Sequence, residues 1–262
     1  MPQLSIDVQK LCKNYDEVRA VKSITFSVKA GETVALLGGN GAGKTTTISM
    51  LLGILLPTAG SIRLLGEDIV ENRFRIMHRI NFSSPYVDLP RRLTVRQNLN
   101  FFCKLYGIVN AKDRVAVLCD ELDLYEFIDR PTGSLSSGQK TRVSVAKALV
   151  NEPEILLLDE PTASLDPDTA DWVRSYLKDY QSRTHAAILL ASHNMSEVER
   201  ICDSVLMMKL GKIVDRGTPS DLLHRYSRTN LEEVFLDIAR DRISPDIQEK
   251  DPPRDNLELG DL

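Results

Sequence analysis

Residues 38–45 read Gly-Gly-Asn-Gly-Ala-Gly-Lys-Thr, and this octapeptide is the strongest indication of fold class in the chain. It matches the phosphate-loop pattern G-x-x-x-x-G-K-[ST] at every specified position. The apolar run Thr33–Leu37 before it predicts a buried strand, and residues 44–52 after it have a helical pattern. In such a strand–loop–helix unit, the N–H groups of the loop and the helix N-terminus bind phosphate. We therefore expect residues 38–45 to hold the phosphates of a nucleotide.

Two carboxylates follow a second apolar run, residues 155–158. Asp159 and Glu160 would stand at the carboxyl end of a buried parallel strand, which is where such sheets bind ligands. We expect Lys44 to reach the β- and γ-phosphates, and the Thr45 hydroxyl and Asp159 to hold Mg²⁺. Glu160 is expected to polarise a water molecule against the γ-phosphate. The alternative is that the two carboxylates only cap a strand in solvent.

Residues 135–139, Leu-Ser-Ser-Gly-Gln, open a predicted helix with small, donor-rich residues. Ser136 or Ser137 suits the N-cap of that helix. A helix N-terminus with Ser and Gly donors is a second phosphate-binding surface in a chain that already has one. One chain with two halves of a site suggests that two chains complete the site together.

The remaining patterns predict an α/β protein. We expect strands near residues 4–8, 24–28, 187–191, 205–208 and 212–214, and helices near residues 93–99, 114–124, 168–180, 195–201 and 231–238. Strands that alternate with helices predict a parallel sheet that is covered on both faces. Residues from about 85 to 131 contain few strand formers, and they predict a helical insertion.

The composition excludes several classes of protein. The chain has 262 residues, of which 42% are hydrophobic, so it can form a large core. No apolar run approaches the roughly 20 residues that span a bilayer, and no secretory signal is visible, so a cytosolic protein is expected. The four cysteines form no Cys-x-x-Cys pair and are expected to be buried free thiols. The net charge of −4 comes from residues 243–262, which also contain prolines and are expected to be disordered. The remainder is neutral and has no basic footprint for nucleic acid.

With these motifs in order, residues 4 to about 240 resemble the ATP-binding cassette (ABC) ATPases. Residues 135–139 are similar to the family signature Leu-Ser-Gly-Gly-Gln, with Ser137 in place of the first glycine. Residues 164–166, Ser-Leu-Asp, resemble the D-loop, and Ser192-His193 resembles the motif of the switch histidine. Tyr15 stands where an aromatic ring of the family stacks on adenine.

The resemblance implies a fold and a set of site residues. The fold is α/β, of the P-loop NTPase type, with a mostly parallel sheet core, an antiparallel β subdomain and a helical subdomain at about 85–150. The ATPase domain is then 1–242. The catalytic residues are Glu160 and His193, and the Mg²⁺ ligands are Thr45 and Asp159. The residues that contact ATP are Tyr15, Gly38, Gly39, Asn40, Gly41, Ala42, Gly43, Lys44, Thr45, Thr46, Ser136, Ser137, Gly138 and Gln139.

The resemblance also implies a head-to-tail pair of cassettes, expected to be a homodimer. Each ATP lies between residues 38–45 of one chain and residues 136–139 of the other. ATP then holds the pair closed, and its hydrolysis lets the pair open.

One position departs from the family pattern. Ungapped matching places Pro85 where the family has a glutamine at the junction with the helical subdomain. Proline offers no side-chain ligand to Mg²⁺ or to a water molecule. Ser84 could substitute, or Mg²⁺ could keep waters there, as Mg²⁺ tolerates well. The hypothesis is that ATP hydrolysis by this chain is slower, or is coupled differently, because of Pro85.

Two functions fit this family. The first is the ATPase subunit of a transporter, at the cytoplasmic face of the cell membrane, docked on a separate membrane permease through residues 81–101. Residues 229–236 resemble the endings of exporter cassettes, although a simple packing helix explains them as well. The second is a soluble ABC ATPase that acts on ribosomes or DNA. The single phosphate loop and the lack of a basic surplus favour the first function.

Overall fold

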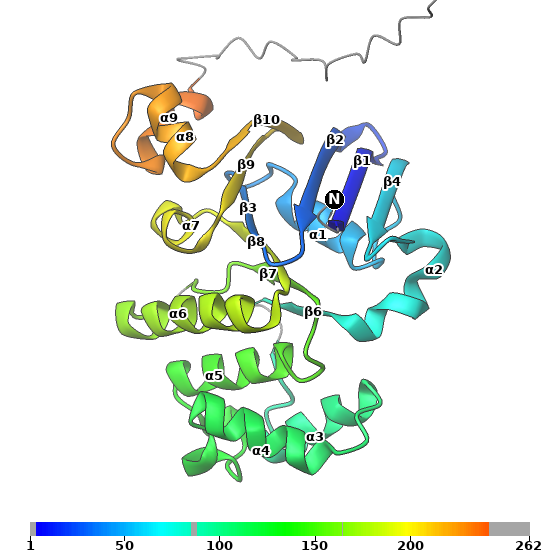
Figure 1. The fold of residues 1–262 in the computed structure, drawn as a ribbon, viewed down its shortest axis with the longest axis vertical. Helices are drawn as coiled ribbons and strands as arrows, with labels where there is room; N and C mark the ends of the chain where they lie inside the picture. Colours follow the sequence, from blue (N-terminus) through cyan, green and yellow to red (C-terminus); the bar gives the residue numbers. More distant parts are fainter. Residues whose placement is uncertain (1–3, 85–87, 164, 241–262) are drawn as a thin grey trace, which may run out of the picture.

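The computed structural model describes residues 4–84, 88–163 and 165–240 (Figure 1). Its strands are β1 (Leu4–Tyr15), β2 (Val18–Lys29), β3 (Thr33–Leu37), β4 (Ala59–Leu64), β5 (Glu67–Asp68), β6 (Ile80–Ser83), β7 (Ile155–Asp159), β8 (Ala187–Ser192), β9 (Ser204–Lys209) and β10 (Lys212–Gly217). Its α-helices are α1 (Lys44–Leu51), α2 (Ile69–Ile76), α3 (Val95–Leu105), α4 (Ala111–Leu122), α5 (Ser137–Ala148), α6 (Pro167–Thr184), α7 (Met195–Ile201), α8 (Pro219–Tyr226) and α9 (Leu231–Ala239).

The larger sheet has the strand order β10-β9-β3-β8-β7-β6. Its pairs from β9 to β6 are parallel, and β10 is antiparallel to β9. Every residue of β3, β7 and β8 is buried. Such nearly continuous apolar strands are typical of a parallel sheet that is covered on both faces. The predicted α/β fold with a mostly parallel core is therefore confirmed.

The two faces of this sheet support two separate hydrophobic clusters. Val34 and Leu36 of β3 pack toward the antiparallel sheet and α1, whereas Ala35 and Leu37 pack toward the helices on the other side. This alternation follows from the pleat, because successive side chains of a strand point to opposite faces.

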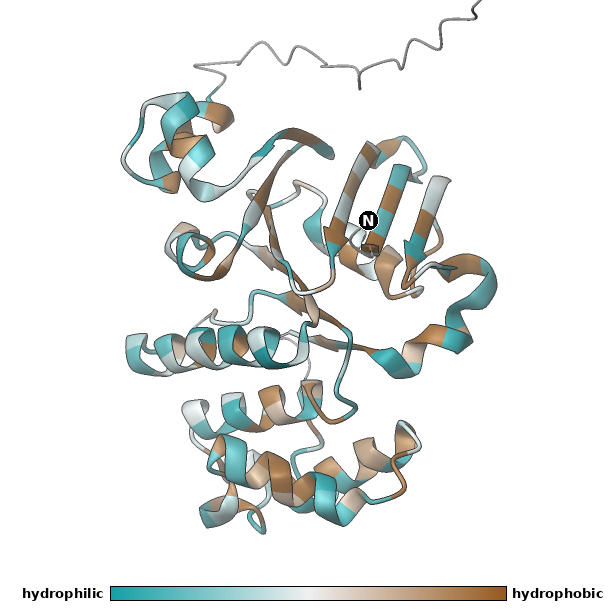
Figure 2. Cartoon of the chain, in the orientation of Figure 1, coloured by the Kyte–Doolittle hydropathy of each residue, from teal (hydrophilic) through white to brown (hydrophobic). Residues whose placement is uncertain are grey.

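The antiparallel sheet has the strand order β2-β1-β4-β5. Figure 2 shows hydrophobic and hydrophilic residues alternating along β1, β2 and β4. Ile6, Val8 and Leu11 of β1 are fully buried on one face, as expected for a half-buried strand. This sheet lies beside β3 and α1, so it borders the phosphate loop (Figure 1).

Helices α3, α4 and α5 gather at the opposite end of the molecule (Figure 1). They fall within residues 85–150, where the sequence indicates a helical subdomain. Residues 243–262 lie outside the described part of the chain. Among the described residues, no helix combines the length and apolarity needed to cross a bilayer. Cys103, Cys119 and Cys202 are buried free thiols, as expected, but Cys12 is only half-buried.

Candidate nucleotide-binding site

The phosphate-loop residues connect β3 directly to α1. Gly43 is the N-cap of α1 and has φ +103°, a left-handed conformation that only glycine adopts easily. A Cβ atom added at Gly43 would lie 2.8 Å from the Ala20 carbonyl oxygen, and one at Gly38 would lie 2.5 Å from the Met208 carbonyl oxygen. These two glycines therefore allow the loop to pack closely on β2 and β9 while it curves over the start of α1.

The Lys44 side chain folds back over the loop. Its Nζ atom donates to the carbonyl oxygens of Gly38, at 2.6 Å, and Gly39, at 3.3 Å. Burial lowers the pKa of Lys44, whereas the nearby charges of Glu160 and Asp159 raise it. The ammonium group thus lies inside the loop, among carbonyl oxygens and close to the two carboxylates.

Thr45 and Asp159 meet at the carboxyl edge of the sheet. The Thr45 hydroxyl donates to Oδ2 of Asp159 at 3.3 Å. Burial raises the pKa of Asp159, and the charge of Glu160 adds to this, whereas the Thr45 hydrogen bond and the Lys44 charge oppose it. No group of three or more His, Cys, Asp and Glu side chains within the described residues could hold a metal ion. Mg²⁺ usually takes one or two protein oxygens together with waters and phosphate oxygens, and a hydroxyl beside a carboxylate fits that mode.

Glu160 and His193 form a second pair next to the first. Oε1 of Glu160 lies 2.6 Å from Nδ1 of His193. The Glu160 side chain is largely buried, whereas the His193 side chain is 62% exposed. Glu160 has φ +54°, which is uncommon for a residue with a Cβ atom. Its N–H donates to the Ala191 carbonyl oxygen at 2.8 Å, which ties this turn to the end of β8.

Tyr15 ends β1 and is 46% exposed, which leaves area on its ring for a planar group. The Nζ atom of Lys13 lies 5.2 Å from the ring centroid. Val18, at the start of β2, is also exposed and pairs with Tyr15 across the two strands.

The sequence offers Ser136 or Ser137 as the N-cap of α5, and the structure shows that it is Ser136. Its hydroxyl accepts the Gln139 N–H, and the Gln139 side chain accepts the Ser136 N–H, so the two form a capping box. Within the described residues, no hydrogen bond joins residues 136–139 to residues 38–45. In Figure 1, α5 lies with the helical group and α1 lies beside the antiparallel sheet. The structure thus brings together Lys44, Thr45, Asp159, Glu160 and His193, but not residues 136–139.

Two motifs from the sequence are only partly described. Pro85 and Ser164 lie outside the described residues. Asp166, the last residue of the Ser-Leu-Asp motif, caps α6 by accepting the Thr169 N–H at 3.0 Å. The Thr169 N–H holds the pKa of Asp166 below its usual value.

Sequence reasoning missed a buried polar group beside the site: Thr162, Ser192 and Glu197. Glu197 follows Asn194 by three residues, and Asn194 caps α7 by accepting the Glu197 N–H. This spacing is a local capping signal. It gives no indication that the Glu197 carboxyl group turns inward.

Comparisons with known proteins agree with this geometry. A family model described as ABC transporter matches residues 21–163. The Nod factor export ATP-binding protein I of Paraburkholderia xenovorans is 37% identical over 250 residues, which cover 94% of this chain and 82% of that protein. The uncharacterized ABC transporter ATP-binding protein YxlF of Bacillus subtilis is 34% identical over 247 residues, which cover 94% of this chain and 80% of that protein.

Solved structures have the same fold. An ATP-binding subunit of an ABC transporter superimposes with a TM-score of 0.81 and 27% identity, covering 89% of this chain and 99% of that chain. The cbiO1 protein from Clostridium perfringens, part of the ABC transporter complex cbiONQ, gives a TM-score of 0.77 and 30% identity, covering 91% of this chain and 97% of that chain.

Proposed function

The chain belongs to the ABC transporter family of ATP-binding subunits, and from this membership we propose that Lys44, Thr45, Asp159, Glu160 and His193 form its ATP-hydrolysing centre. The activity is hydrolysis of ATP to ADP and phosphate, coupled to transport. The observation that carries the assignment of residues is the 2.6 Å contact between Glu160 and His193, next to Lys44 and the Thr45–Asp159 pair.

Each residue has a role that follows from its position. The N–H groups of residues 38–45 and the Lys44 ammonium bind the β- and γ-phosphates. The Thr45 hydroxyl and the Asp159 carboxylate would hold Mg²⁺, which neutralises phosphate charge. Glu160, beside this pair, orients and polarises the attacking water. His193 is exposed, so it can contact the γ-phosphate while Nδ1 stays on Glu160.

A second chain is proposed to complete each site. Residues 136–139 do not reach the phosphate loop of their own chain, although they open the 12-residue helix α5 with exposed serines. The capping box occupies the N–H groups of Ser136 and Gln139. The Ser136 oxygen accepts the Gln139 N–H, but its O–H can still donate. This O–H, the Ser137 hydroxyl and the N–H groups of Ser137 and Gly138 are proposed to face an anion from outside the chain. A partner's γ-phosphate matches this charge and this position. A homodimer with two such sites follows.

The membrane partner is proposed to dock beside α2 and α3. In Figure 1, α2 precedes β6 beside the antiparallel sheet, and α3 lies farther along with α4 and α5. Phe74 of α2 is 81% exposed, and Phe101 and Leu105 of α3 are also exposed. Phe101 and Leu105 are four residues apart on α3 and so share one face of that helix, and exposed apolar side chains that lie together are typical of interaction surfaces. The chain would then work at the cytoplasmic face of the membrane. The proposed direction is export, in line with the Nod factor export relatives.

Isolation of the native complex tests this function. The full-length chain is captured from solubilised membranes, and its partners and its ATPase activity are measured together. The proposal expects an integral membrane subunit and activity that Lys44→Ala abolishes. Recovery of ribosomes or DNA in place of a membrane subunit would identify the soluble alternative instead.

A further inference from the structure

Glu197 is a buried acid that the proposed mechanism does not use. It lies in the first turn of α7 and is 1% exposed. Both oxygens of its carboxyl group accept a hydrogen bond: the Thr162 hydroxyl donates to Oε1 at 2.7 Å, and the Ser192 hydroxyl donates to Oε2 at 2.8 Å. Burying a carboxyl group costs free energy unless its oxygens are satisfied, and here both are.

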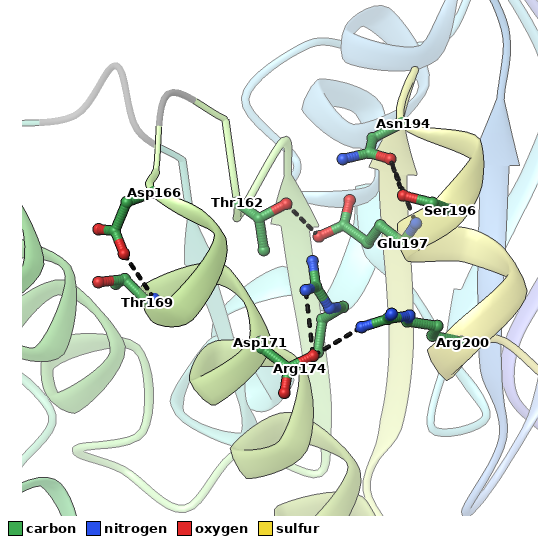
Figure 3. Close-up of polar contacts among 9 residues, drawn as sticks. All are labelled: Thr162, Asp166, Thr169, Asp171, Arg174, Asn194, Ser196, Glu197 and Arg200. Carbon is green, nitrogen blue, oxygen red and sulfur yellow. Dashed lines mark hydrogen bonds and ion pairs between the residues drawn. The ribbon is translucent and has the colours of Figure 1, made fainter.

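The two hydroxyl groups come from the two segments that carry Glu160 and His193. Thr162 follows Glu160 by two residues, and Ser192 directly precedes His193. Glu197 therefore connects the turn after β7 to the turn after β8. In Figure 3 the Thr162 hydroxyl, on the segment after β7, points at the Glu197 carboxyl group on α7.

The turn that carries His193 is closed around the same carboxyl group. The Ser192 oxygen accepts the Asn194 N–H at 2.9 Å while its hydroxyl donates to Glu197. The Asn194 side chain in turn accepts the Glu197 N–H and the Ser196 hydroxyl (Figure 3). These bonds restrict Ser192 and Asn194, the two residues that flank His193.

The turn that carries Glu160 needs such support. With φ +54°, Glu160 is in a left-handed conformation that persists only when surrounding contacts hold it. The Ala163 N–H donates to the Glu160 carbonyl oxygen at 3.0 Å, so residues 160–163 form a tight turn. The Thr162–Glu197 bond fixes that turn from inside the protein.

The two hydroxyl donors partly offset the effect of burial on the Glu197 carboxyl group, whose pKa remains above its usual value. Burial raises the pKa of Glu197, and the hydrogen bonds from Thr162 and Ser192 lower it. The Glu160 charge raises this pKa and the Arg174 charge lowers it. In Figure 3 the Arg174 side chain points toward Glu197, and Arg174 pairs with Asp171 at 3.2 Å.

We propose that Glu197 is a positioning residue, which holds Glu160 and His193 in their 2.6 Å contact through the hydroxyl groups of Thr162 and Ser192. It acts without touching the nucleotide, because its carboxyl group is closed off from solvent. The inference rests on the proposed roles of Glu160 and His193.

Three variants of the full-length chain test this role by kinetics. Glu197→Ala removes both hydrogen bonds, and the expected loss in kcat is about ten- to a hundredfold, because small displacements of reacting groups have effects of that size. KM for ATP stays within about twofold, because the phosphate loop is untouched. Glu197→Gln keeps the shape and can still bond both hydroxyls, since a hydroxyl also accepts, so kcat is largely rescued. Glu232→Ala, at an exposed acid of α9, is the matched control and stays at the wild-type rate.

Histidine NMR gives a readout that is independent of turnover. The chain has four histidines, and a His193→Ala spectrum assigns the His193 imidazole signal. Glu197→Ala shifts or broadens that signal, whereas Glu197→Gln and Glu232→Ala leave it in place. If Glu197→Ala does not fold, Thr162→Val and Ser192→Ala each remove one of the two bonds and are expected to lower kcat and move the same signal.

Three results would overturn the inference. The first is a Glu197→Ala variant with an unchanged His193 signal and an unchanged kcat. The second is an equal loss of kcat in Glu197→Ala and Glu197→Gln. The third is a KM for ATP that rises by the same factor as kcat falls. Failure of the proposed function is a separate outcome, seen as a Glu160→Gln chain that hydrolyses ATP at the wild-type rate.

Discussion

Nδ1 of His193 lies 2.6 Å from Oε1 of Glu160, although the two residues follow different strands of the sheet. The contact fixes one ring nitrogen on the carboxylate and leaves Nε2 for another partner. Because β7 and β8 are parallel neighbours, their carboxyl ends deliver both side chains to the same edge as the phosphate loop. Under the proposed roles of Glu160 and His193, hydrolysis and detection of the γ-phosphate would be coupled in this one pair of residues.

Glu160→Gln should stop hydrolysis and spare ATP binding. The substitution removes the charge that polarises water, so kcat is expected to fall about 10²- to 10⁴-fold. Binding is retained because Lys44 and Thr45 are unchanged. Phosphate release and ATP affinity measure the two effects, with Glu232→Gln, an exposed acid of α9, as the matched control. A variant that loses affinity and turnover in proportion would contradict this role.

Asp159→Asn should stabilise the ligand-free chain near neutral pH. Burial raises the pKa of Asp159 above its unfolded value. Between the ordinary carboxyl pKa and the raised one, the folded state therefore binds more protons than the unfolded state. The free energy of unfolding falls as pH rises through this window, because the buried carboxyl group becomes charged. The expected rise in Tm is about 2–4 °C at neutral pH.

The pH dependence of that gain is the control. Below the ordinary carboxyl pKa both states are protonated, and the advantage of Asp159→Asn should vanish. A gain in Tm that is the same at every pH would show that buried charge is not its cause. The variant should also lose the requirement for Mg²⁺ in nucleotide affinity.

Tyr15→Ala should weaken ATP binding without changing kcat. Loss of a stacking surface for a base typically weakens binding about tenfold, and Tyr15→Phe keeps that surface. Tyr125→Ala removes another exposed tyrosine, from the helical subdomain, and controls for surface effects. Equal ATP affinity in the Ala and Phe variants would exclude stacking by Tyr15.

Pro85→Gln tests the departure from the family pattern. A glutamine supplies the amide oxygen that proline lacks, so basal or partner-stimulated turnover is expected to rise. Both rates are measured on the chain alone and on the complex with its membrane subunit. If neither rate changes, the proline does not slow or uncouple hydrolysis.

The parts of the site that sequence predicts are those with local physical causes. The glycines of residues 38–45 impose the loop by themselves, because Gly43 needs φ +103° and has no room for a Cβ atom. The run 155–158 predicts a buried strand, and its position before Asp159 and Glu160 predicts the edge of the sheet. Strand pairing then brings His193 to the same edge.

The parts that sequence misses depend on distant partners. Strand β6 (Ile80–Ser83) has four residues, and its place in the sheet is decided by pairing with β7. Glu197 stands in a polar helical pattern that indicates the surface, whereas Thr162, 35 residues earlier, draws its carboxyl group inside. Helix α8 was missed despite a local signal, because Thr218, Pro219 and Asp221 form a capping box with proline in the first turn.

We propose that each ATP lies between residues 38–45 of one chain and residues 136–139 of another. Two full-length variants test it, each inactive alone: Lys44→Ala, and Ser136→Asp, which still caps α5 but repels phosphate. When the two variants are mixed, they form mixed dimers. One site of each mixed dimer combines Lys44 of the Ser136→Asp chain with the wild-type residues 136–139 of the Lys44→Ala chain. The mixture is expected to regain up to about a quarter of the wild-type ATPase rate, from one intact site in each mixed dimer. A mixture that forms mixed dimers and stays as inactive as its components would show that the two segments do not share a site.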